Sequence, residues 1–150
     1  MLRSVLVYLL VLAVTVVIGV TTHSLFVMHA WTMAAAQAAD AVPPSLSVPE
    51  HLNWIGHDIV GMGPMYGALA GVALLVAFIV AGLLARVTGS RTIVFVVAGA
   101  VAMLVLFTTL RAVLDTVAIF GARGAIGLAA QAAVGGLAGL LFATFKPSAA

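Results

Sequence analysis

Four long apolar stretches dominate this sequence, and each is long enough to cross a lipid bilayer. They cover approximately residues 4–36, 59–85, 92–118 and 123–145. A transmembrane helix needs about 20 predominantly apolar residues, and every stretch meets this length. Only 7% of the 150 residues are charged, whereas a soluble domain carries roughly 25%. The chain cannot cover a water-facing surface, so the sequence predicts an all-α integral membrane protein.

The connections between these stretches predict a single domain, a compact up-and-down bundle of four transmembrane helices. Residues 39–57 contain three prolines and form the only long loop, because proline removes a backbone donor and interrupts a helix. Residues 86–91 contain Gly and Ser between two arginines and predict a tight turn. Gly121 and Gly124 mark a break between the third and fourth helices.

The first apolar stretch has two interpretations, a cleaved signal peptide or an uncleaved transmembrane helix. Arg3 resembles the positive start of a signal peptide, and Ala36-Gln37-Ala38 resembles a cleavage site. The apolar core of a signal peptide is about 7–15 residues long, and this stretch is longer. We therefore expect an uncleaved transmembrane helix.

The distribution of Lys and Arg predicts the orientation of the bundle, since short cytoplasmic loops are enriched in both. The turn after the second stretch contains Arg86 and Arg91, whereas the long loop contains neither Lys nor Arg. With four spans, Arg3 and Lys146 fall on the same side as that turn. The sequence thus predicts that both termini are cytoplasmic, the long loop is outside, and the membrane is a bacterial inner membrane.

Polar side chains within the third and fourth stretches are the first candidates for a functional site. They are Thr108, Arg111, Asp115, Arg123 and Gln131. Arg111 and Asp115 are four residues apart, a spacing that lets two side chains on one helix meet. A charge at the bilayer centre costs about 2.5–3.5 kcal/mol on insertion scales, so such residues are often functional. One interpretation is a pathway for protons or ions; the other, which we favour, is a structural clamp near the outer interface.

Small residues at steps of four predict that helices pack closely. They are Gly67 and Gly71 in the second stretch, and Gly127, Gly135 and Gly139 in the fourth. Small residues let two backbones approach, which favours helix association in lipid. Gln131 lies in the same row, and a buried amide needs hydrogen-bond partners. We expect these rows to pack within the chain or between copies of it.

Histidine and methionine residues on the outer side allow a different interpretation, a metal or haem site. The set is His29, Met33, His51, His57, Asp58 and Met62. Imidazole with thioether suits copper, and two histidines from different helices can ligate haem iron. The spacing is diagnostic of neither, and methionine in membrane helices usually serves packing. Copper or haem therefore stays an alternative.

The sequence contains no sign of an enzyme active site. It has no cysteine, which excludes disulfides and thiolate chemistry, and no phosphate-binding glycine loop or HExxH motif. Its scattered basic residues do not form a nucleic-acid surface. We expect a non-enzymatic protein in contact with lipid that assembles as a homo-oligomer or as a subunit of a membrane complex, with a transport or ligand-binding pathway as one role. The alternatives are a metal- or haem-binding redox protein, and a proton- or ion-coupled channel or transporter that uses Arg111 and Asp115.

Overall fold

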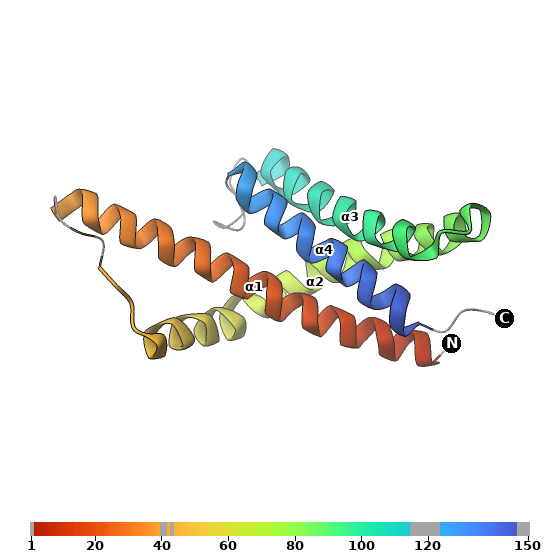
Figure 1. Cartoon of the computed structure of the whole chain (residues 1–150), viewed down its shortest axis with the longest axis horizontal. Helices are drawn as coiled ribbons and strands as arrows, with labels where there is room; N and C mark the ends of the chain where they lie inside the picture. Colours follow the sequence, from red (N-terminus) through yellow and green to blue (C-terminus); the bar gives the residue numbers. More distant parts are fainter. Residues whose placement is uncertain (1, 40–41, 43, 115–123, 147–150) are drawn as a thin grey trace.

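A computed structural model describes residues 2–39, 42, 44–114 and 124–146, and in them four helices form an up-and-down bundle (Figure 1). The helices are α1 (Leu2–Ala39), α2 (Val48–Thr88), α3 (Arg91–Leu114) and α4 (Ala125–Phe145). Each is long and apolar enough to cross a membrane. The predicted all-α bundle of four helices, each long and apolar enough to span a membrane, is therefore confirmed.

The helices differ in length, and this shapes the molecule. α3 has 24 residues and α4 has 21, which gives roughly 36 and 32 Å at 1.5 Å per residue, close to the thickness of about 30 Å of a hydrocarbon core. α1 and α2 have 38 and 41 residues, or roughly 57 and 62 Å. The end of α1 and the start of α2 consequently extend past α3 and α4 (Figure 1). We call this projection, residues 25–39 and 48–58, the arm.

α2 begins at Val48, whereas the sequence predicts a loop over residues 39–57. The connection between α1 and α2 is therefore shorter than predicted. The backbone N–H and the hydroxyl of Ser47 both donate to the Glu50 carboxylate at 2.7 Å, as in a capping box. Pro49 lies in the first helical turn, where its missing N–H has no intrahelical partner to lose. The prolines of this segment therefore led to the prediction of a loop at a position where a helix begins.

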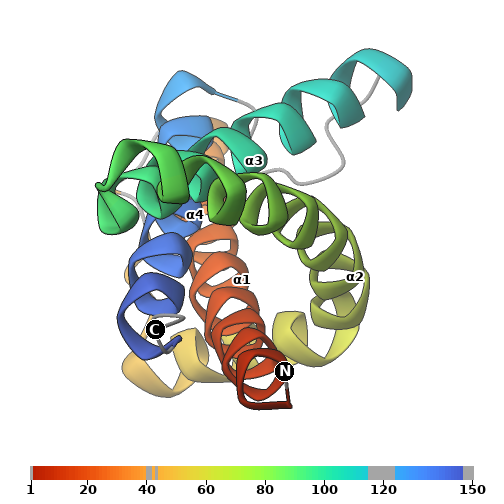
Figure 2. The ribbon, with the colours of Figure 1, turned by 90° about the vertical axis from the view of Figure 1, so that its right-hand side faces the viewer.

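Pro64 lies inside α2, where a proline removes one backbone hydrogen bond and bends the helix. Figure 2 shows α2 as a curved helix, from yellow at its start to green at its end. The curve lets one helix contribute to both the arm and the bundle.

The connection between α2 and α3 is the tight turn that the sequence predicts. Gly89 follows the last residue of α2 with a φ of 69°, a left-handed conformation that glycine adopts without strain. Its N–H donates to the carbonyl oxygen of Ala85 at 3.3 Å. α3 then begins two residues later, at Arg91.

Glycines bring the backbones of α3 and α4 into direct contact, and this pair is the most extensive in the molecule. A Cβ on Gly99 would lie 2.0 Å from the carbonyl oxygen of Gly135, and one on Gly135 would lie 2.2 Å from that of Gly99. A Cβ on Gly139 would lie 2.0 Å from the carbonyl oxygen of Phe95. The small-residue row of the fourth helix therefore packs within the chain, against α3.

The other glycines of the predicted rows also lie at contacts within the chain. A Cβ on Gly67 would lie 3.0 Å from Val16, and one on Gly71 would lie 3.1 Å from Leu12, so both face α1. Gly127 is buried in α4. The glycines of these rows thus pack α2 against α1 and α4 against α3.

Candidate functional site

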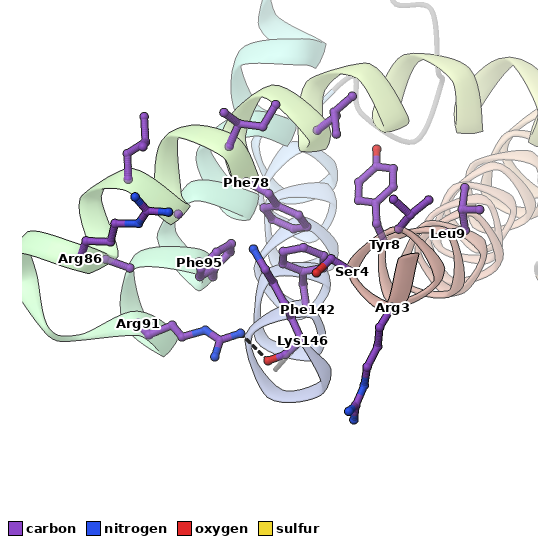
Figure 3. A pocket seen from close by; sticks show the side chains of 16 residues that line it. Arg3, Ser4, Tyr8, Leu9, Phe78, Arg86, Arg91, Phe95, Phe142 and Lys146 are labelled. Carbon is purple, nitrogen blue, oxygen red and sulfur yellow. Dashed lines mark hydrogen bonds between the residues drawn. The ribbon is translucent and has the colours of Figure 1, made fainter. Parts of the chain in front are cut away.

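A cavity of about 1020 Å³ opens at the end of the bundle where α1 begins and α4 ends (Figure 3). Four basic side chains line it, one for each helix: Arg3 from α1, Arg86 from α2, Arg91 from α3 and Lys146 directly after α4. Among the described residues that line it there is no Asp or Glu. The sequence placed these four residues on one side of the bundle, but it did not indicate that they share a cavity.

Aromatic rings form one wall of this cationic cavity. Phe78 and Phe142 are stacked with ring centroids 4.7 Å apart, and Phe95 lies 5.4 Å from Phe142. The ammonium group of Lys146 lies 5.2 Å from the ring centroid of Phe142 and 5.9 Å from that of Phe95. A cation over aromatic faces is attracted by their quadrupoles, so the rings orient the lysine without neutralising it.

Hydrogen bonds fix two parts of the cavity wall. The guanidinium of Arg91 donates to the carbonyl oxygen of Lys146, which ties the start of α3 to the end of α4 (Figure 3). The hydroxyl of Tyr8 donates to the carbonyl oxygen of Gly71 and so ties α1 to α2. The cavity is thus bounded by helices that are linked to one another.

The positive charges in the cavity repel one another, and this repulsion affects the pKa of Lys146. Partial burial lowers the pKa of its ammonium group, and the positive charges of Arg91 and Arg86 lower this pKa further. A bound anion would oppose this lowering of the pKa, since a nearby negative charge favours the charged form of the ammonium group.

Aliphatic side chains of α1 and α2 line the rest of the cavity. They are Val5, Leu9, Leu75, Ile79 and Leu83. Each is exposed, as expected for side chains that face lipid. The cavity is therefore amphiphilic, with cations on one side and an aliphatic wall on the other.

Gln131 is fully buried in the middle of the bundle, at 0% exposure. Its amide oxygen accepts a hydrogen bond of 2.8 Å from Tyr66, and its amide nitrogen donates to the carbonyl oxygen of Gly19 at 3.1 Å. A Cβ on Gly19 would lie 2.0 Å from the Tyr66 hydroxyl, so this position needs glycine. The network links α1, α2 and α4.

Our sequence analysis missed Tyr66 and Gly19. A signal for Tyr66 was present, because the chain has only two tyrosines and this one lies in the middle of an apolar span. A buried phenol needs a hydrogen-bond partner, and Gln131 offers an acceptor within another span.

A second cluster of polar side chains lies at the base of the arm. The hydroxyl of Ser24 donates to the carboxylate of Asp58 at 2.6 Å and so joins α1 to α2. Ser24 and His23 are both buried, and the charge of Asp58 acts on the imidazole of His23. Sequence reasoning named Asp58 as a metal ligand but passed over the other two, because their contact with it depends on how α1 and α2 are aligned.

The polar residues predicted around the end of the third helix do not share the environment of Gln131. Thr108 and Arg111 are exposed on α3. The Thr108 hydroxyl donates to the carbonyl oxygen of Leu104 in its own helix, at 2.7 Å. Asp115 and Arg123 lie outside the described residues. The described part of this cluster therefore contains no buried site.

Two of the predicted metal or haem ligands have other hydrogen-bond partners in the structure. The set comprises His29, Met33, His51, His57, Asp58 and Met62. His51 forms a hydrogen bond of 2.9 Å with the carbonyl oxygen of Ser47, and Asp58 accepts one from Ser24. In the ranges that the structure covers, no group of three or more His, Cys, Asp or Glu side chains is placed to hold a metal ion. Metal or haem binding by the His and Met residues of this set stays a hypothesis from the sequence.

No protein family matches this chain, and neither a curated protein nor a solved structure is significantly similar to it. The helices themselves define its class, which is a small integral membrane protein with four candidate spans. Any function is therefore argued from the residues of the chain.

Proposed function

We propose that this protein is non-enzymatic and associates with a second copy of itself through the arm, outside the hydrocarbon core. The observation that carries this proposal is a group of large apolar side chains exposed on the arm. They are Leu25, Trp31, Met33, Val48 and Leu52, with exposed fractions between 44% and 72%.

The position of the arm makes this exposure informative. The lengths of α3 and α4 match the hydrocarbon core, so the arm, which extends past them, lies among headgroups or in water. Exposed apolar side chains are ordinary in lipid. In water they cost about 25 cal/mol per Å² of apolar surface, and contiguous apolar patches there commonly mark interfaces.

The arm cannot cover these side chains by itself, because it contains only two helices. Its own contact is small: Met28 and Ala36 are buried, and the rings of Trp31 and Trp54 meet with centroids 6.1 Å apart. Leu25, Met33, Val48 and Leu52 remain exposed, and Trp31, whose ring meets Trp54, is still 47% exposed. A partner is therefore needed to remove them from water.

A second copy is the partner that we favour. The two described carboxylates of the arm, Glu50 and Asp58, are each hydrogen-bonded to a serine of the same chain, so the large exposed apolar side chains are the groups on the arm that most need a partner. Every copy presents the same patch in the same place, and twofold pairing of identical patches is the commonest form of oligomer. The glycine rows do not support this proposal, because they are occupied within the chain.

The orientation of the protein is part of the same proposal. The four basic residues of the cationic cavity gather at the end opposite to the arm, and basic residues favour the cytoplasmic side. The start of α1 and the end of α4 lie at this cationic end (Figure 1). We therefore place the termini in the cytoplasm and the arm outside, with the protein in a bacterial inner membrane.

The test is the mass of the protein in lipid nanodiscs at several concentrations. The arm variants are Leu25→Ser and Leu52→Ser, and the control is Val87→Ser, an apolar residue that is 87% exposed at the other end of the molecule. We expect the wild type to dimerise and each arm variant to raise the dissociation constant about tenfold, because each loses the burial of one leucine. The control should dimerise like the wild type.

Two results would contradict self-association. One is a strictly monomeric wild type at micromolar concentration, which leaves a subunit of a larger complex as the alternative. The other is arm variants that dimerise as tightly as the wild type, which would move the interface elsewhere.

A further inference from the structure

We propose that the cationic cavity binds an anionic phospholipid, with the phosphate among the basic residues and an acyl chain along the aliphatic wall of α1 and α2. This inference does not depend on self-association, because the cavity and the arm lie at opposite ends of the molecule.

The first argument is charge. Arg3, Arg86, Arg91 and Lys146 line one cavity, in a folded chain that has only six Lys and Arg residues. Arg86, Arg91 and Lys146 lie together on one side of it, whereas the guanidinium of Arg3 points away from them (Figure 3). Like charges this close repel one another, and a bound anion would offset that repulsion. Basic cavities between transmembrane helices at this level of the bilayer suit anionic lipid headgroups.

The second argument is the kind of donor. Three of the four cations are arginines, whose planar guanidinium groups bind phosphate oxygens in pairs. Arg86 and Lys146 face the cavity beside Arg91 (Figure 3), and the hydrogen bond from Arg91 to the carbonyl oxygen of Lys146 holds these two residues together. The ammonium of Lys146 is oriented by the rings of Phe95 and Phe142. These groups form a fixed surface of donors.

The third argument distinguishes a lipid from a soluble phosphate. The cations lie at the ends of the helices, where headgroups are found, and the cavity continues onto exposed aliphatic side chains of two helices. Val5 and Leu9 lie on α1, and Leu75, Ile79 and Leu83 lie on α2. Inorganic phosphate has no apolar part that could pack against these aliphatic side chains, whereas an acyl chain gains dispersion contacts with them.

The experiment titrates the full chain in detergent with phosphatidylglycerol and counts bound lipids by native mass spectrometry. Phosphatidylcholine and inorganic phosphate are the comparison ligands. We expect phosphatidylglycerol to bind at least about tenfold more tightly than phosphatidylcholine, because each cation near a membrane surface contributes about 1 kcal/mol, or about fivefold, towards an anionic lipid. Inorganic phosphate at an equal concentration should not displace it.

The variants Arg86→Gln and Lys146→Gln test the site itself, and Arg111→Gln is the matched control. Arg86 and Arg111 are both exposed basic residues in the last turn of a helix, but only Arg86 lines the cavity. We expect Arg86→Gln and Lys146→Gln each to weaken phosphatidylglycerol binding about fivefold and Arg111→Gln to leave it unchanged. Thermal unfolding of each variant separates loss of binding from loss of fold.

Several outcomes would overturn the proposal. Equal binding of the two lipids would remove the role of charge. Displacement by inorganic phosphate would show an anion site that does not recognise lipid. An effect of Arg111→Gln as large as that of Arg86→Gln would show that binding follows net charge and not the cavity.

Discussion

The bundle and the arm share α1 and α2, but different interactions hold them. In the bundle, glycines bring the backbones of α3 and α4 together, and Gln131 bonds to two further helices. In the arm, the contact between α1 and α2 includes the rings of Trp31 and Trp54 and the buried Met28 and Ala36, and a hydrogen bond from Ser24 to Asp58 joins the two helices at its base. The bundle is thus held by contacts among four helices, whereas the arm is held by one contact between two helices.

The difference follows from the solvent. Lipid gives apolar side chains no reason to leave it, so the helices of the bundle need close backbone packing and polar cross-links. In the placement proposed above, the arm lies outside the hydrocarbon core, where water drives apolar side chains together, but a contact between two helices is too narrow to bury all of them. Changes in the bundle should therefore destabilise the whole chain, and changes in the arm should act locally.

The largest expected effect is at the α3–α4 contact. Gly139→Ala places a Cβ 2.0 Å from the carbonyl oxygen of Phe95, so the two helices must separate. Overpacking of this kind costs about 1–3 kcal/mol, and more where backbone is the obstacle. We expect the free energy of unfolding, measured by denaturant titration in mixed micelles, to fall by about 3 kcal/mol.

Gly82→Ala is the control for that change, because a Cβ on Gly82 of α2 would meet nothing within 4 Å. Its helix propensity should raise stability by up to about 1 kcal/mol. Equal stability of the two variants would contradict the backbone contact between α3 and α4.

The next largest effect concerns the buried amide. Gln131→Leu removes the hydrogen bonds to Tyr66 and Gly19 and leaves a phenol without its acceptor, which should cost about 1–3 kcal/mol of unfolding free energy. Adding Tyr66→Phe should then cost less than it does in the wild type, since the phenol has already lost its partner. Strictly additive losses in this double-mutant cycle would argue against the bond.

A smaller and local effect is expected at the base of the arm. Ser24→Ala removes the hydrogen bond to Asp58, which contributes about 1 kcal/mol. Hydrogen exchange should become faster in residues 25–39 and 48–58, while the amides of α3 and α4 keep their protection. Faster exchange across all four helices would show that the arm and the bundle open together.

The sequence predicted most of the fold, because the length of an apolar run and the scarcity of charge report the bilayer directly. It did not predict the start of α2, since the prolines at 43–49 masked the Ser47–Glu50 cap. It identified Gly135 and Gly139 as packing residues but not their partner Gly99, which is an isolated glycine in α3. A single glycine has no periodicity to reveal it.

The sites were harder to predict, because they join residues far apart in the chain. Gln131 was visible as a lone amide, whereas its contact with Gly19 spans more than a hundred residues. For the four basic residues of the cavity, the sequence predicted only that they lie on the same side of the membrane. That they line one cavity depends on how four helix ends meet, and hydropathy carries no information about that.

The smallest expected effect is a pH dependence at the cationic end of the bundle. Burial and the charges of Arg91 and Arg86 lower the pKa of Lys146 below its usual value of 10.5. Between the lowered pKa and 10.5 the unfolded chain binds more protons than the folded chain, so the free energy of unfolding should rise with pH across this window. Below the window both states are protonated, and the contribution does not change.

Comparison of wild type with Lys146→Met at each pH isolates this contribution, because other titrating groups are common to both. The difference in unfolding free energy should change only slightly, since Lys146 is partly exposed and screened by solvent. Phosphatidylglycerol should reduce the slope further if its phosphate lies beside the ammonium, because an anion raises the lysine pKa towards its usual value. A slope of the opposite sign would mean that Lys146 already has an anionic neighbour in the folded chain, and the cavity would then be less positive than its basic residues imply.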